Sequence, residues 1–226
     1  MTRKFFGFTL GEILIALGVI GVVASLTLPQ IINDKKASEA QAQFTTAYAE
    51  ISKAINEMEV DNVPIEPANY TKNRSFYPVF KQYFKVVVDK GYSTDGKTYK
   101  YFKNKNINDE DMKRFGDGHF VINNGMDIFI YNSKNSKSGL VVWVDINGNN
   151  KLPNTLGYDL FGFELMRGGQ FMPLGSTGTT DSTWAADPKK SCKYDADKPE
   201  DRGSGATCSL YAVSNSDYFK TLYKGH

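Results

Sequence analysis

Residues 1–32 read MTRKFFGFTLGEILIALGVIGVVASLTLPQII, and this stretch decides the fold. The apolar run over residues 8–28 is long enough to cross a membrane as a helix, which needs about 20 residues. Two positive charges, Arg3 and Lys4, precede the run, and one carboxylate, Glu12, lies near its start. A carboxylate in a bilayer costs about 2.5–3.5 kcal/mol on insertion scales, and less near the interface. The position of Glu12 therefore needs a physical reason.

The N-terminal segment admits three interpretations. A signal peptide would have the basic start, an apolar core and a cut after a small residue such as Ala24. A plain membrane anchor would keep the whole apolar run. The third interpretation is a short basic leader that ends at Gly7, so that cutting makes Phe8 the new N-terminus.

The residues that follow the apolar run predict a second, amphipathic half of the same helix. Apolar side chains recur there in steps of three and four, which is typical of one helix face: Ala37, Ala40, Phe44, Ala47, Ile51, Ala54 and Met58. Pro29 is predicted to interrupt or kink this helix. From residue 8 to residue 58 the helix would measure roughly 75 Å. A cleaved signal peptide has no need for such continuity, so the pattern favours an anchor.

The string KFFGFTLGEILIALGVIGVVASLTLP resembles the N-terminus of type IV pilins and type II secretion pseudopilins. That family has a short basic leader ending in glycine, then a phenylalanine, a glutamate at the fifth place after the cut and a proline at the twenty-second. Gly7, Phe8, Glu12 and Pro29 occupy those places. Gly11 departs from the pattern, because the family more often carries an aliphatic residue there.

The resemblance implies an α+β fold, in which a long N-terminal helix packs on a small antiparallel sheet. The expected organisation is a leader (1–7), a transmembrane and filament-core helix (8–32), the amphipathic half of that helix (33–60) and a globular head (61–226). The implied function is that of a structural subunit of an extracytoplasmic helical filament, of the type II secretion or type IV pilus class.

The resemblance also implies partners and a location. Prepilin peptidase would cut after Gly7 and methylate the amine of Phe8. The subunit would wait in the inner membrane as a single-pass protein with its head outside the cytoplasm, in contact with the lipid bilayer and the inner-membrane assembly machinery. It would then join other pilin or pseudopilin subunits in a periplasmic or cell-surface filament.

Glu12 and Pro29 are the expected assembly residues. After the cut, Glu12 would pair with an α-ammonium group, either its own or that of a neighbouring subunit, because a buried carboxylate is tolerated only when paired. The alternative is that Glu12 reaches the interface and pairs with nothing.

The head sequence predicts three or four antiparallel strands. Residues 119–131 contain two β-rich runs joined by Asn-Gly, a strong hairpin signal. Residues 139–146 are nearly all apolar and predict a central strand, and residues 160–165 predict a fourth strand. Residues 75–91 have apolar steps of three and four and predict a short helix with Pro78 in its first turn.

The segment DINGNNKLPNTLGYD, residues 145–159, is a candidate metal loop. It fails as an EF-hand, because the glycine comes two places too early and a leucine replaces the bidentate glutamate. A looser calcium cage from Asp145, Asn147, Asn149 and Asp159 is the candidate, and some major pseudopilins bind calcium in a head loop. The alternative is that these residues form turns and that the carboxylates accept backbone N–H groups.

The cysteines Cys192 and Cys208 are expected to form a disulfide, because an even, late pair in an exported protein is typical of one. A free thiol pair or a zinc site fits less well, since the spacing differs from CxxC. Many type IV pilins carry a disulfide-closed loop near the C-terminus.

No catalytic constellation appears in the sequence, so we expect no enzyme. The formal net charge of +2 is accounted for by the two basic residues of the leader, and charge alone implies no nucleic acid. Calcium is the one cofactor considered. The alternative function is a monomeric binding protein, membrane-anchored or secreted outside the cytoplasm, with a prepilin-like leader.

Overall fold

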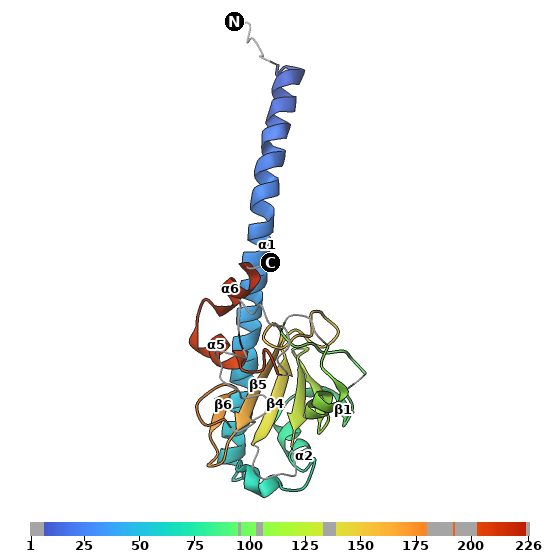
Figure 1. Ribbon diagram of the computed structural model, residues 1–226, viewed down its shortest axis with the longest axis vertical. Coiled ribbons are helices and arrows are strands. Elements are labelled where there is room, and N and C mark those ends of the chain that lie inside the picture. Colours follow the sequence, from blue (N-terminus) through green and yellow to red (C-terminus); the bar gives the residue numbers. More distant parts are fainter. Residues whose placement is uncertain are drawn as a thin grey trace, which may run out of the picture.

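The computed structural model consists of one long helix and an α+β head (Figure 1). It describes residues 7–94, 96–102, 106–132, 139–179, 192 and 203–224. Most of the expected leader, residues 1–6, lies outside the described residues. Helix α1 (Leu10–Val60) projects from the head over its first half, and its second half lies along the sheet.

The first half of α1 is an exposed apolar helix. Apart from Ala24, which is partly covered, residues 10–32 are exposed, and their length and composition fit a membrane span. The helix continues without a break through Pro29, so the expected interruption does not occur. Proline removes only one backbone donor, and the turns on both sides keep their own hydrogen bonds.

The second half of α1 buries the predicted stripe. All seven residues of the stripe are buried against the head, together with Ile55. Phe44 is the centre of this contact, with ring centroids 4.7 Å from Phe161 and 5.7 Å from Phe219. Burial of this apolar surface holds the helix on the sheet.

The head contains one six-stranded antiparallel sheet in the order β1-β2-β3-β4-β5-β6. The strands are β1 (Val86–Gly91), β2 (His119–Ile122), β3 (Asp127–Tyr131), β4 (Leu140–Asp145), β5 (Leu160–Leu165) and β6 (Phe171–Pro173). Strand β4 lies inside the sheet with all six residues buried, because both faces are covered. Val142 and Val144 belong to the core beneath α1, whereas Val141 and Trp143 belong to a second core with Tyr99 and Phe115.

The expected short helix with Pro78 in its first turn is confirmed, but the helical spacing that continues to Val87 does not give a helix there. A helical turn, α2 (Tyr77–Phe80), and a short 3-10 turn, η2 (Lys81–Tyr83), are followed directly by β1. The three consecutive valines 86–88 have high β propensity, and pairing with β2 decides their conformation. Strand β6 was also not expected.

Short helical segments complete the head. They are η1 (Pro67–Tyr70), α3 (Asp109–Met112), η3 (Lys113–Phe115), α5 (Cys208–Ser214) and α6 (Tyr218–Lys224). Helix α6 packs on α1 close to the point where α1 leaves the head (Figure 1). This places the C-terminal segment over the first turns of the buried half of α1.

Candidate functional site

The N-terminal site begins with a capping box that closes the first turn of α1. The backbone N–H of Glu12 donates to Thr9 Oγ1 at 3.3 Å, and the backbone N–H of Thr9 donates to Glu12 Oε2 at 2.8 Å. This reciprocal pair satisfies two donors that a helix end otherwise leaves free. The sequence Thr-x-x-Glu is the signature of such a box and would have revealed it.

The structure brings Gly7, Phe8 and Glu12 together at the exposed tip of α1. Phe8 is 84% exposed, and no atom lies within 4 Å of a Cβ built on Gly7. Pro29 lies 17 residues beyond Glu12, roughly 25 Å farther along the helix. The backbone next to Gly7 is therefore open to another protein, and the head contributes no contact there.

The second candidate site is the loop after β4, and Asp145 is its starting point. Asp145 is the last residue of β4, paired with Asp127 of β3 on one side and Leu160 of β5 on the other. Its side chain is fully buried, and neither carboxyl oxygen has a hydrogen-bond partner. The amides of Asn147 and Gly148 lie close enough to lower its pKa somewhat, without forming hydrogen bonds of good geometry.

Further oxygens without partners come from the same loop. The side-chain carbonyl oxygens of Asn147, Asn149 and Asn154 are buried and accept no hydrogen bond. The hydroxyl of Tyr99 forms no hydrogen bond of good geometry either; burial and Asp145 raise its pKa, and the nearby side chain of Asn149 opposes this shift. Buried polar atoms without hydrogen-bond partners are rare, and each one costs free energy. The number of such atoms in this loop and next to it therefore needs an explanation.

The donor set fits a hard cation such as calcium. Calcium takes six to eight oxygen ligands, including carboxylates and the carbonyl oxygens of Asn side chains. Within the described residues, no group of three or more His, Cys, Asp or Glu side chains is arranged to hold a metal. A cation here would meet the oxygens without partners on Asp145, Asn147, Asn149 and Asn154, beside the carboxylate of Asp159.

Asp159 differs from Asp145 in being hydrogen-bonded within the loop. Its carboxylate accepts the backbone N–H groups of Asn154 at 2.8 Å and Thr155 at 2.6 Å, and the side-chain amide of Asn147 at 3.2 Å. Asp159 therefore shapes the loop, as the alternative interpretation of the sequence expected of its carboxylates. Asn154, which the sequence analysis missed, supplies the additional free oxygen, and its positive φ of 52° is a conformation that Asn tolerates well.

The electrostatics of the loop favour a positive partner. Burial raises the pKa of Asp145 well above its usual value, and the charges of Asp159 and Asp127 raise it further. Burial also raises the pKa of Asp159 to about 6, although its hydrogen bonds oppose this shift. A cation between these groups would favour their ionised forms.

Asp127, a buried carboxylate close to Asp145, has hydrogen-bond and charge partners that stabilise its ionised form. Its Oδ1 lies 2.6 Å from His119 Nε2 and 3.1 Å from Lys90 Nζ, and its Oδ2 accepts the backbone N–H of Asn149 at 3.0 Å. Burial opposes ionisation here too, but the hydrogen bonds from His119 and Asn149 leave the pKa lowered. The carboxylate of Asp145 has no such hydrogen-bond partners, so Asp145 is the carboxylate here whose charge is not compensated.

The loop also requires a glycine at one position. Gly148 has a φ of +84°, and a Cβ there would lie 2.5 Å from the backbone oxygen of Gly125 in the β2–β3 hairpin. Any other residue would displace one of the two turns. The hairpin therefore holds the loop in place from one side.

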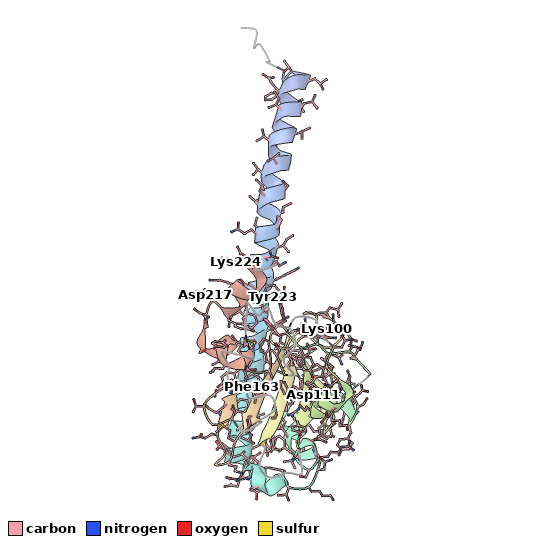
Figure 2. The ribbon with its side chains drawn as sticks, viewed as in Figure 1. Lys100, Asp111, Phe163, Asp217, Tyr223 and Lys224 are labelled. Atoms are coloured by element: carbon pink, nitrogen blue, oxygen red, sulfur yellow. A yellow bond between two sulfur atoms is a disulfide. The ribbon has the colours of Figure 1, made fainter. Side chains whose placement is uncertain are left out.

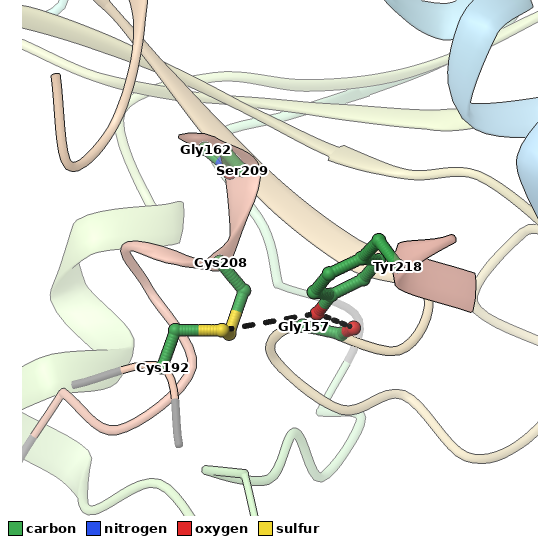
Figure 3. Close-up of a disulfide and its surroundings, with 6 residues drawn as sticks. All are labelled: Gly157, Gly162, Cys192, Cys208, Ser209 and Tyr218. Atoms are coloured by element: carbon green, nitrogen blue, oxygen red, sulfur yellow. Dashed lines mark hydrogen bonds between the residues drawn. A yellow bond between two sulfur atoms is a disulfide. The ribbon is translucent and has the colours of Figure 1, made fainter. Parts of the chain in front are cut away.

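The disulfide holds the loop from the other side. Cys192 and Cys208 are bonded in the structure, and a Cβ on Gly157 would lie 2.9 Å from Cys208 Sγ. The hydroxyl of Tyr218 donates to the backbone oxygen of Gly157 at 2.6 Å and lies 4.0 Å from Cys192 Sγ (Figure 3). The two features that the sequence suggested separately, the metal loop and the cysteine pair, are thus neighbours. Most of the segment between the cysteines, residues 193–202, lies outside the described residues.

Comparisons with protein-family models, curated proteins and solved structures each returned no match for this chain.

Proposed function

We propose that this protein is a structural subunit of an extracytoplasmic helical filament of the type II secretion or type IV pilus class. The observation that carries the proposal is the division of α1, whose first half exposes an apolar surface while its second half is buried on the head. Such a surface needs lipid or other helices around it. The spacing of Gly7, Phe8, Glu12 and Pro29 supports the filament class.

Glu12 has two roles in this proposal, one before the leader is cut and one after. In the intact chain it caps the helix through Thr9. Cutting after Gly7 creates an α-ammonium group on Phe8, one helical turn away. A neighbouring subunit then offers the same group, and Glu12 pairs with it during assembly, so the carboxylate enters the filament core neutralised.

Three variants separate the two roles of Glu12. Glu12→Gln keeps a side-chain oxygen for the cap and removes the charge, Glu12→Ala removes both, and Thr9→Ala breaks the cap and keeps the charge. All three should insert into membranes and be cut. We expect Thr9→Ala to enter filaments and both Glu12 variants to stay in the membrane, measured by immunoblotting of sheared filaments against the membrane fraction. Normal incorporation of Glu12→Gln would refute the charge role.

The processing step has its own measurement. Mass spectrometry of the mature protein should find Phe8, methylated, at the N-terminus. A start at Ser25 would instead indicate a signal peptide and would remove the filament proposal together with the anchor.

The loop after β4 supports a second proposal, a calcium site in the head. The buried oxygens without partners on Asp145, Asn147, Asn149 and Asn154 are the observation that favours it. Occupation would stabilise the folded head by about 2.7 kcal/mol at a calcium concentration one hundred times the dissociation constant. The role would be structural, fixing a head surface for assembly.

Thermal unfolding of the full chain in detergent tests the calcium site, with magnesium as the control cation. Calcium should raise the melting temperature of the wild type, and Asp145→Asn should abolish this rise. The same variant should be no less stable than the wild type when a chelator is present, because it removes an unpaired buried carboxylate. A wild-type melting temperature unaffected by millimolar calcium would end the proposal.

The alternative, a monomeric anchored or secreted binding protein, makes a different prediction. Site-specific crosslinking along residues 10–32 in cells should join copies of the chain or related subunits if it assembles. Monomers alone, at normal expression and after normal processing, would favour the binding protein.

A further inference from the structure

The end of the head from which α1 emerges carries a pocket. Its volume is about 300 Å³, and it lies between α1, the loop after β4 and α6. Lys36, Glu39 and Gln43 line it from α1, Lys151 and Leu152 line it from the loop, and Tyr223 lines it from α6. Figure 2 shows Tyr223 and Lys224 beside α1 at this end of the head.

The position of this pocket along α1 places it next to a bilayer. Ala37, the first residue of α1 that is buried, comes five residues after Ile32, the end of the exposed apolar run. This is roughly 7 Å along the helix axis. The headgroup layer of a bilayer is about 5–7 Å thick on each side of the hydrocarbon core. If residues 10–32 span the membrane, the near end of the pocket, at Lys36, lies at the level of the lipid headgroups, and the pocket extends from there along α1 to Gln43, on the order of 16 Å beyond Ile32.

The charges around the pocket favour an anionic headgroup. Lys35, Lys36, Lys151 and Lys224 form no ion pair among the described residues, and all four are exposed. Among the described residues, the acidic groups here are Asp34, Glu39, Asp217, which is paired with Lys220 at 3.4 Å, and Asp159, whose charge helps to raise the pKa of Tyr223 in the pocket wall. Lysine side chains near a membrane surface attract anionic lipids. The carboxylate of Glu39 can accept hydrogen bonds from the hydroxyl groups of a glycerol headgroup.

Leu152 adds an apolar contact at the same level. It is 78% exposed at the tip of the loop, beside Lys151. An exposed leucine flanked by lysines and a tyrosine is a combination suited to the membrane interface, where apolar and charged groups both find partners.

We propose that this pocket binds the headgroup of an anionic phospholipid, phosphatidylglycerol, and thereby holds the head flat against the outer face of the membrane. Lys36 and Lys151 contact the phosphate from opposite walls, Glu39 accepts from the glycerol hydroxyls, and Leu152 enters the interface. The proposal rests on the membrane span of the proposed function and is independent of filament assembly. It would orient α1 in the membrane.

The test uses the full chain in nanodiscs, one chain per disc, with tryptophan introduced at residue 152 (Leu152→Trp). The discs contain phosphatidylcholine alone or with phosphatidylglycerol, both brominated near the top of the acyl chains, because bromine quenches tryptophan only at contact. The matched control is Val60→Trp, which places tryptophan at the far end of α1, where Val60 is 79% exposed. The wild type corrects for the native tryptophans.

We expect quenching at residue 152 to rise on the order of twofold when phosphatidylglycerol is present, and to fall again at high salt. The double variant Lys36→Glu with Lys151→Glu should remove this rise, whereas Lys53→Glu with Lys72→Glu should retain it. Equal quenching in both lipids, or a rise that survives reversal of Lys36 and Lys151, would overturn the proposal. A rise that is absent with one chain per disc and appears only in discs prepared with two chains would also overturn it, because the occupant would be a second copy.

The outcome is distinguishable from failure of the proposed function. A chain without a membrane span would not enter the discs, whereas a chain that enters them and fails the quenching test leaves filament assembly untouched.

Discussion

The two halves of α1 share one helix and differ in every contact. Phe44 in the second half is 2% exposed and lies among phenylalanines of β5 and α6, whereas Leu14 in the first half is 62% exposed. One continuous helix thus has two environments, the apolar core of the head for its second half and the exterior of the protein for its first half. The second half is held by the head, and the first half has an apolar surface that only lipid or other helices can cover.

The largest effect is expected when one large side chain in each half of α1 is truncated to alanine. Phe44→Ala should lower the free energy of unfolding of the head by about 3–5 kcal/mol, because it leaves a cavity among aromatic rings. Leu14→Ala should change it by less than about 0.5 kcal/mol, because Leu14 is 62% exposed on the half of α1 that projects from the head. Chemical unfolding of the full chain in detergent, followed by near-ultraviolet circular dichroism, measures both. A similar loss in both variants would mean that the exposed half also packs on the head.

Reduction of the disulfide is expected to have the next largest effect. Cys192 and Cys208 are separated by 16 residues, and opening this loop should cost the head about 3 kcal/mol in the chain-entropy model. It should also weaken calcium binding, since the disulfide packs on Gly157 of the candidate loop. Unfolding with and without reductant, each with calcium or chelator, separates the two effects. Insertion of the first half of α1 into membranes should be unaffected.

Enlarging one alanine in each half gives a smaller contrast. Ala47 is fully buried beneath the head, and Ala47→Leu should destabilise it by about 1–3 kcal/mol through overpacking. Ala16 is exposed, and Ala16→Leu should leave the unfolding of the head unchanged. A neutral Ala47→Leu would show that the contact between α1 and the sheet has more room than the structure gives it.

The periodic parts of the fold could be predicted from the sequence. The stripe from Ala37 to Met58 gave the buried face of α1, and Asn124-Gly125 gave the β2–β3 hairpin. The residues of strand β1 do not by themselves distinguish a strand from a helix. Val87 fits a helical spacing with Phe80 and Phe84 as well as it fits a strand, and pairing with β2 decided the outcome.

The sequence predicts which residues of the candidate loop carry oxygen ligands. It does not predict which of these oxygens stay without hydrogen-bond partners in the folded loop. Asp145, Asn147 and Asn149 stand out as an oxygen-rich spacing, and the structure leaves their oxygens without partners. Asp159, the fourth expected ligand, also accepts N–H groups from its own loop, a role that its position in the sequence did not specify. Asn154 joined the set only through the folded shape of the loop.

The sequence by itself determined the linear features: the apolar run of 8–28, its charged start, the capping signature around Glu12 and the stripe that follows. These features depend on residues three or four apart in the chain, and helix geometry alone places such residues on the same face. Only the tertiary structure decided that the disulfide packs against the loop after β4, that Asp127 has hydrogen-bond partners while the carboxylate of Asp145 has none, and that Lys36 and Lys151 line the same pocket. Those contacts join residues far apart in the chain, and the packing of the sheet against α1 determines which of them meet.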